Sequence, residues 1–198
     1  MSNVTYGLGK ILCRMIYYGL FRLSVHGRDH IPEQGPIILC SNHISNLDPP
    51  LVGLPLTRRV HFMAKEELFK VPVLGYLIRA VGAFPVKRGG VSKESIKTAL
   101  TLLKQGKVLG IFPEGTRRSQ DGAAKRGAAV LALRAHAQVV PVAIVGRYKV
   151  FSKLAIYYGE PLDLSDCKDE EGNPSPDLAT EKIMQAIQAL LDAHGKQS

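Results

Sequence analysis

The chain of 198 residues has no tryptophan, three cysteines and fewer acidic than basic residues. Cys13, Cys40 and Cys167 are odd in number and widely spaced, which argues against a disulfide framework or a structural zinc site and favours a reducing cytoplasm. No segment reaches the roughly 18 apolar residues that a membrane-spanning helix needs. No N-terminal stretch combines a basic start, an apolar run and a small-residue cleavage site, so we do not expect a secretory signal.

The shortage of acidic residues makes the chain strongly basic. It has 26 Lys and Arg against 17 Asp and Glu, a net charge of +9. Its partners should therefore be anionic: nucleic acid, an acidic lipid surface, or a phosphorylated substrate or carrier. Without tryptophan, a paired-cysteine zinc module or a run of aromatic residues among basic ones, a nucleic-acid partner is not expected.

Short apolar segments alternate with helical patterns along most of the chain, with turn-forming residues between them. This rhythm predicts a single α/β domain with a mostly parallel central sheet flanked by helices. Pro72 should kink or split the second predicted helix. The predicted strands are Pro36–Asn42, Val60–Ala64, Gly82–Val86, Val108–Phe112 and Val139–Val145, and the predicted helices are Pro49–Thr57, Glu66–Ala80, Ser92–Gln105, Gly127–His136 and Asp177–Ala193.

The first 24 residues predict an amphipathic helix, which leaves residues 25–198 for the main domain. Apolar residues recur at spacings of three and four, and three basic residues lie off that stripe. The helix could pack on the domain core or lie at a membrane surface with its basic residues near anionic headgroups. The stripe consists of Val4, Leu8, Ile11, Leu12, Met15, Ile16, Leu20 and Leu23, and the basic residues are Lys10, Arg14 and Arg22.

A histidine and an aspartate follow the first predicted strand. His43 and Asp48 would lie about 140° apart on a regular helix, so they can meet only if His43 precedes the helix, which Pro49 as a first helical residue would allow. Asp48 could then fix the tautomer of His43 and leave its other nitrogen free to take a proton from a hydroxyl. Because there is no G-x-S-x-G nucleophile motif, we expect the substrate hydroxyl to be the nucleophile.

Two further strands are also followed by polar groups. Gly82–Arg88 and Ile111–Arg117 should bring their side chains to the same edge of a parallel sheet as His43. The basic residues there could bind a phosphate, Gly115 would let backbone approach it, and Gly127, as the start of a helix, would add free N–H groups. The basic residues are Arg88, Arg117, Lys125 and Arg126.

Four sequence blocks in this order resemble the glycerolipid acyltransferase family, specifically its 1-acylglycerol-3-phosphate (lysophosphatidate) acyltransferases. They are N-H-x4-D at Asn42–Asp48, G-x-[FI]-x-x-x-R at Gly82–Arg88, F-P-E-G-T-R at Phe112–Arg117, and V-P-V-x-[IV] at Val140–Ile144. The resemblance extends from about residue 25 to residue 159. It implies that His43 is the general base, that Asp48 orients it, and that Arg88, Glu114, Gly115 and Arg117 help to bind a glycerol phosphate.

Together these arguments predict transfer of a fatty acyl group from acyl-CoA or acyl carrier protein to a lysophospholipid hydroxyl, at the cytoplasmic face of a membrane whose anionic surface binds the enzyme. No metal or cofactor is implied. The alternatives are transfer to another lysolipid, a lipid ester hydrolase with the same His-Asp pair, and a lipid-binding module without activity. The predicted catalytic residues are His43 and Asp48, and the predicted substrate-binding residues are Asn42, Lys87, Arg88, Glu114, Gly115, Thr116, Arg117, Lys125, Arg126 and Gly127.

Overall fold

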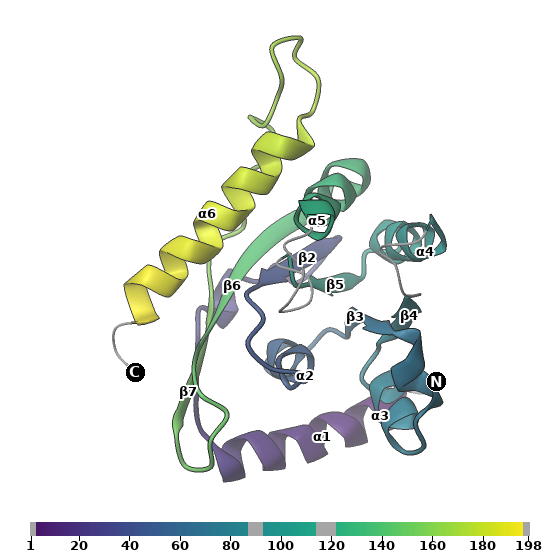
Figure 1. Ribbon diagram of the computed structural model, residues 1–198, viewed down its shortest axis with the longest axis vertical. Coiled ribbons are helices and arrows are strands. Elements are labelled where there is room, and N and C mark those ends of the chain that lie inside the picture. The colour runs from purple at the N-terminus through teal and green to yellow at the C-terminus, as the bar shows by residue number, and fades with distance from the viewer. Residues whose placement is uncertain (1–2, 87–92, 114–121, 196–198) are drawn as a thin grey trace.

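The computed structural model describes residues 3–86, 93–113 and 122–195. Within these ranges a seven-stranded sheet has the strand order β1-β7-β6-β2-β5-β3-β4 (Figure 1). Neighbouring strands are parallel except for β6 and β7, which are antiparallel. The strands are β1 (Arg22–His26), β2 (Ile37–Ser41), β3 (Val60–Lys65), β4 (Phe84–Val86), β5 (Val108–Ile111), β6 (Gln138–Gly146) and β7 (Lys153–Tyr158).

Helices cover both faces of this sheet, so both faces of the central strands are apolar. Alternate residues of β2 point to opposite sides. Ile37 and Leu39 pack with α1 and α2, whereas Ile38 and Cys40 pack with α4, α5 and α6. The helices are α1 (Asn3–Leu20), α2 (Asp48–Gly53), α3 (Leu74–Ala80), α4 (Lys93–Lys104), α5 (Gly122–Ala135) and α6 (Pro176–His194), with 3-10 turns η1 (Arg28–His30) and η2 (Glu66–Lys70).

The predicted fold class, one α/β domain with a mostly parallel sheet, is confirmed. Pro72 separates η2 from α3, as expected. The two strands that we did not predict, β1 and β7, pair with each other at one side of the sheet. Leu23, which we placed on the N-terminal helical stripe, lies in β1, because its spacing also suits the alternating burial of that strand.

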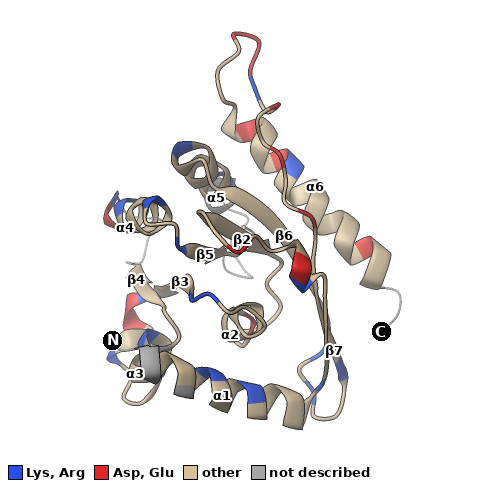
Figure 2. Ribbon diagram, turned by 180° about the vertical axis from the view of Figure 1, so that it is seen from behind, with Lys and Arg blue, Asp and Glu red and all other residues tan. Residues whose placement is uncertain are grey.

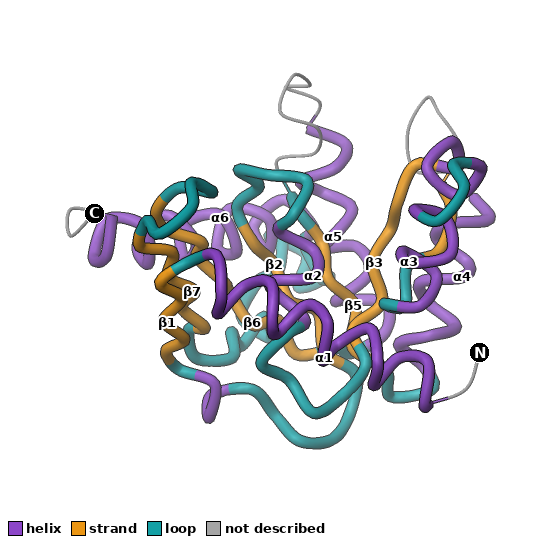
Figure 3. Tube along the Cα trace, turned by 90° about the horizontal axis from the view of Figure 1, so that it is seen from below, coloured by secondary structure: helices purple, strands orange, loops and turns teal. Residues whose placement is uncertain are grey.

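Helix α1 lies on the same side of the sheet as α2 and contacts α2, α3 and β1 (Figure 3). It packs through a face that we did not single out. Arg59 stacks over Tyr6 at 4.4 Å from its ring centroid, Lys10 donates to the carbonyl of Leu56, and Tyr17 is buried in the core. Five residues of the predicted apolar stripe point away from the domain: Ile11, Leu12, Met15, Ile16 and Leu20 are all exposed.

No helix in the described part of the chain has the length and apolar character needed to cross a membrane.

Candidate active site

The loop between β2 and α2 brings His43 and Asp48 together. Asp48 is the first residue of α2, and His43 lies outside the helix, as the sequence required. The His43 Nδ1 and the Asp48 Oδ2 are 2.7 Å apart. Because an ionised carboxylate only accepts hydrogen bonds, this contact places the proton on Nδ1 and leaves Nε2 as a proton acceptor.

The side chain of Asp48 is fully buried, with 0% exposed, and it accepts four hydrogen bonds. Its Oδ2 accepts from His43 and also from the backbone N–H groups of Ile44 and Ser45, each at 2.7 Å. Its Oδ1 accepts from the hydroxyl of Tyr148 at 2.6 Å. Buried carboxylates are costly unless they are fully hydrogen-bonded, so this set of donors stabilises Asp48 in one orientation.

Tyr148 also contacts Asp48, and sequence reasoning did not single it out. It follows β6, 100 residues from Asp48, and no local motif marks it. Burial, and then its hydrogen bond to Asp48, raise the pKa of Tyr148 above its ordinary value. The hydroxyl therefore keeps its proton and acts as a donor to Asp48.

Helix α1 also supports the β2–α2 loop. The Tyr17 hydroxyl donates to the carbonyl of Leu47, the residue before Asp48, and burial raises the pKa of Tyr17. Phe21, just after α1, packs edge-on against Tyr148 with ring centroids 5.6 Å apart. The N-terminal helix is thus part of the scaffold that positions Asp48.

Asn42, which we expected to bind substrate, is used within the protein. It is buried, its Oδ1 accepts from the Ile144 N–H at 2.7 Å, and its Nδ2 donates to the Ile144 carbonyl at 3.0 Å. This pair of bonds fastens the end of β2 to β6, where the V-P-V-x-[IV] block lies. The geometry favours a structural role for Asn42, with His43 as the residue it positions.

A stack of aromatic rings fixes the other side of His43. Phe112, from the F-P-E-G-T-R block, lies against the imidazole with ring centroids 4.3 Å apart, and Phe62 lies 6.1 Å beyond it. Gly110 makes room for this arrangement, since a Cβ there would come within 2.0 Å of the Phe62 ring. The end of β5 therefore aligns His43 through packing.

Most of the predicted phosphate-binding residues lie outside the described residues: Lys87, Arg88, Glu114, Gly115, Thr116 and Arg117. Lys125 lies on α5, but its side chain is not described. Arg126 is exposed and pairs with Asp177 of α6 at 3.3 Å. The prediction that Gly127 begins a helix is wrong: α5 begins at Gly122, so the Gly127 N–H lies beyond the first turn, whose N–H groups alone lack helical partners.

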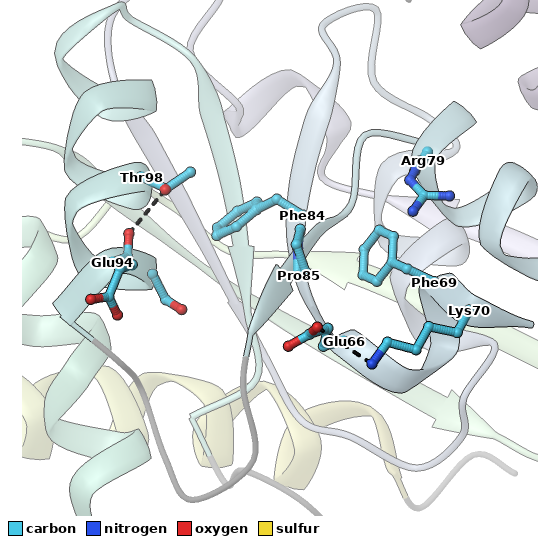
Figure 4. Close-up of a pocket in the computed structure, with 9 residues that line it drawn as sticks. Glu66, Phe69, Lys70, Arg79, Phe84, Pro85, Glu94 and Thr98 are labelled. Atoms are coloured by element: carbon cyan, nitrogen blue, oxygen red, sulfur yellow. Dashed lines mark hydrogen bonds and ion pairs between the residues drawn. The ribbon is translucent and has the colours of Figure 1, made fainter.

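A cavity of about 490 Å³ lies beside β4, between η2 and α4 (Figure 4). Phe69, Phe84 and Pro85 line its apolar part. Polar groups at its rim are tied to neighbours, with Lys70 3.6 Å from Glu66. The β2–α2 loop that carries His43 contributes none of its lining residues.

Comparison with known proteins identifies the family. The Acyltransferase family model matches residues 22–145, more than half of the chain. The chain belongs to the acyltransferase family. The match includes His43, Asp48 and the ends of β4 and β5, which confirms the family that the four blocks predicted.

Individual relatives cover most of this acyltransferase. A protein of Bacillus subtilis named 1-acyl-sn-glycerol-3-phosphate acyltransferase is 33% identical over 174 residues, covering 85% of this chain and 87% of the relative. One of the same name from Streptococcus pneumoniae is 34% identical over 157 residues, covering 74% and 59%. The crystal structure of the 1-acyl-sn-glycerophosphate acyltransferase PlsC from Thermotoga maritima superposes with a TM-score of 0.64 at 26% identity, covering 94% of this chain and 78% of that one.

Proposed function

We propose that this acyltransferase moves a fatty acyl group from a thioester donor, acyl-CoA or acyl carrier protein, to the free hydroxyl of 1-acylglycerol-3-phosphate, forming phosphatidate. The observation that carries the proposal is the His43–Asp48 pair: a buried carboxylate fixes one imidazole nitrogen, and the other has no hydrogen-bond partner among the described residues. The names of the relatives support the choice of acceptor.

The geometry of this pair supports the following reaction. His43 Nε2 takes the proton of the acceptor hydroxyl as its oxygen attacks the thioester carbonyl. Backbone N–H groups stabilise the resulting oxyanion. The carbon–sulfur bond then breaks, the acyl group stays on the acceptor oxygen, and the thiolate leaves with the proton from His43. Asp48 stabilises the imidazolium that exists between the two proton transfers.

A second part of the proposal concerns the acceptor phosphate, which Arg88 and Arg117 would bind together with Lys87, Glu114, Gly115, Thr116 and Lys125. One of the blocks that contain the two arginines includes β4, and the other directly follows β5. The carboxyl ends of these parallel strands share one edge of the sheet with that of β2. Guanidinium groups bind phosphate through paired, charge-assisted hydrogen bonds.

Arg88→Ala and Arg117→Ala are each expected to raise the KM for lysophosphatidate about tenfold or more, with a much smaller change in kcat. A hydrogen bond to a charged group contributes about 1.5–3 kcal/mol, and a phosphate contact is present in ground and transition states alike. Steady-state kinetics with each substrate varied in turn would measure this. An increase confined to the donor KM would assign the arginines to a donor-docking surface instead.

Tyr148→Phe is expected to lower kcat about tenfold without a large change in either KM. The substitution removes one hydrogen bond to a buried carboxylate, worth about 1.5–3 kcal/mol, but leaves the ring that packs on Phe21. Tyr157→Phe is a matched control, because Tyr157 lies on β7 and stacks with His26 and His194, away from Asp48. Equal activity of the two variants would show that Tyr148 does not position the catalytic pair.

The membrane surface forms the third part of the proposal: the exposed apolar stripe of α1 would enter the headgroup region of an anionic bilayer, bringing the site to its lipid acceptor. Arg14 and Arg22 are exposed and fit that role. Lys10 does not, because it bonds to Leu56 and burial lowers its pKa. Substitutions on the stripe test this better than removal of the helix, which would also remove Tyr17.

An acceptor screen with a labelled acyl donor tests the proposed reaction directly. Transfer to lysophosphatidate in preference to glycerol 3-phosphate and other lysolipids is the expected result. Preference for another lysolipid would keep the chemistry and change the acceptor. Release of free fatty acid without an acceptor would instead identify a hydrolase that uses the same His-Asp pair on water.

A further inference from the structure

The turn between β6 and β7 has a phenylalanine where the backbone favours glycine. The Ser152 N–H donates to the Lys149 carbonyl at 2.9 Å, which closes a four-residue turn. Phe151, its third residue, has φ of 62°. A turn with positive φ at that position normally has Gly or Asn there, because a side chain at positive φ is strained.

Packing does not explain this phenylalanine. The Phe151 side chain is 75% exposed and its neighbour Val150 is also exposed. An exposed ring gains little from packing, and a side chain at positive φ costs backbone strain. Glycine at this position would therefore make the folded chain at least as stable. The side chain therefore has to be explained by something outside the chain.

A second turn repeats the pattern. Val73, between η2 and α3, has φ of 62° and ψ of −55°, and the Leu74 N–H donates to the Pro72 carbonyl across it at 2.6 Å. This is a γ-turn of the strained hand, in which a β-branched residue is a clear outlier. Val73 is 73% exposed, so the two strained turns carry the two most exposed large apolar side chains in the described part of the chain.

Both turns flank the exposed stripe of α1. The Phe151 N–H donates to the Leu20 carbonyl at the end of α1, at 2.7 Å. Helix α3, which follows Val73, contacts α1. Figures 1 and 3 show the β6–β7 turn and α3 near opposite ends of α1, on the same side of the molecule.

The charge around the β6–β7 turn and α1 indicates which kind of surface would bind there. The β6–β7 turn carries Arg147 and Lys149, and β7 begins with Lys153; all three are exposed, and neither the turn nor α1 contains an acidic residue (Figure 2). Exposed apolar side chains among basic ones fit an anionic lipid surface, where the rings and alkyl groups enter the acyl boundary and the cations stay among the headgroups.

We propose that the β6–β7 turn and the η2–α3 turn are membrane contacts in addition to α1, and that Phe151 and Val73 enter an anionic bilayer on either side of that helix. This rests on the membrane part of the proposed function. Tyr148, three residues before Phe151, donates to Asp48. Contact through this turn therefore holds the catalytic pair at the bilayer surface, in an orientation that a single helix does not fix.

Cosedimentation of the full chain with vesicles of equal parts phosphatidylglycerol and phosphatidylcholine tests the proposal. Phe151→Gly is expected to weaken binding about tenfold, as loss of a buried apolar ring would, while its melting temperature equals or exceeds that of the wild type because the strain is removed. Val73→Gly should change both quantities in the same directions. Because the lost interaction is apolar, the ratio to wild-type binding should persist at high salt.

Two matched variants serve as controls. Phe151→Leu keeps an apolar side chain in the turn and should bind nearly as well as the wild type. Leu178→Ala removes an exposed leucine from the first turn of α6, at the far end of the molecule from α1, and should change nothing (Figure 1).

The outcomes distinguish the contact through the two turns from membrane binding through α1. Wild-type binding together with unchanged binding of Phe151→Gly and Val73→Gly would overturn the two-turn contact and leave α1 alone. Failure of the wild type to bind anionic vesicles would overturn both this inference and the membrane part of the proposed function. Equal losses with Leu178→Ala would show that the effect is not specific to this face, and would also overturn the inference.

Discussion

Replacing His43 with alanine is expected to lower kcat by roughly 10²–10⁴ or more, because the change removes the general base. The contacts of His43 leave one ring nitrogen available for this role. The imidazole contacts Asp48 through one nitrogen and Phe112 through its face, which leaves the second nitrogen for the acceptor hydroxyl. Initial rates at saturating donor and acceptor would measure the effect.

A matched change at His136 separates chemistry from charge or folding. His136 is an exposed histidine directly after α5, and His136→Ala should retain full activity. Vesicle binding of His43→Ala should stay close to wild type, and its melting temperature should fall only modestly, because Asp48 keeps three of its four hydrogen bonds. A variant that folds and retains most of its activity would rule out the proposed mechanism.

Asp48→Asn is expected to lower kcat by about 10⁴, the scale seen when an orienting carboxylate beside a catalytic histidine becomes an amide. The size of the side chain hardly changes, but the amide nitrogen cannot accept a hydrogen bond. One of the four donors that now reach Asp48 would lose its partner, or His43 would take the wrong tautomer. Rates and the pH dependence of kcat would record the loss.

The same substitution should also destabilise the protein by about 1–3 kcal/mol, the cost of leaving one buried polar group unpaired. Asp192→Asn is the control, because Asp192 is exposed on α6 and, among the residues that the structure describes, its side chain accepts from Gln188. Denaturant unfolding of both variants would give the difference. Should Asp48→Asn be fully active, Asp48 would be a structural residue and His43 would work without an orienting partner.

The contact between His43 and Asp48 was predictable because its determinants are local. A strand of apolar residues ends at Ser41, Pro49 and Pro50 start a helix, and the intervening loop is too short to separate His43 from Asp48. The boundaries of the central strands were similarly predictable, since strands buried on both faces are continuous apolar runs.

The strands β1 and β7 were missed for a related reason. Their burial alternates from residue to residue, so they lack the continuous apolar run of the central strands. Leu23 fits both the period of a strand and the period of the preceding helix, so spacing alone could not assign it. Only their pairing with each other, and of β7 with β6, made them strands.

The sequence by itself determined the fold class, the family and the closeness of His43 to Asp48, because apolar periodicity and short motifs act between near neighbours. The tertiary structure decided which face of α1 docks, since both the Tyr17 side and the Met15 side are apolar and only the shape of the domain distinguishes them. It also decided the partners of Asp48 and Asn42. Tyr148 and Ile144 lie about 100 residues away, and contacts of that separation depend on how the strands are ordered in the sheet.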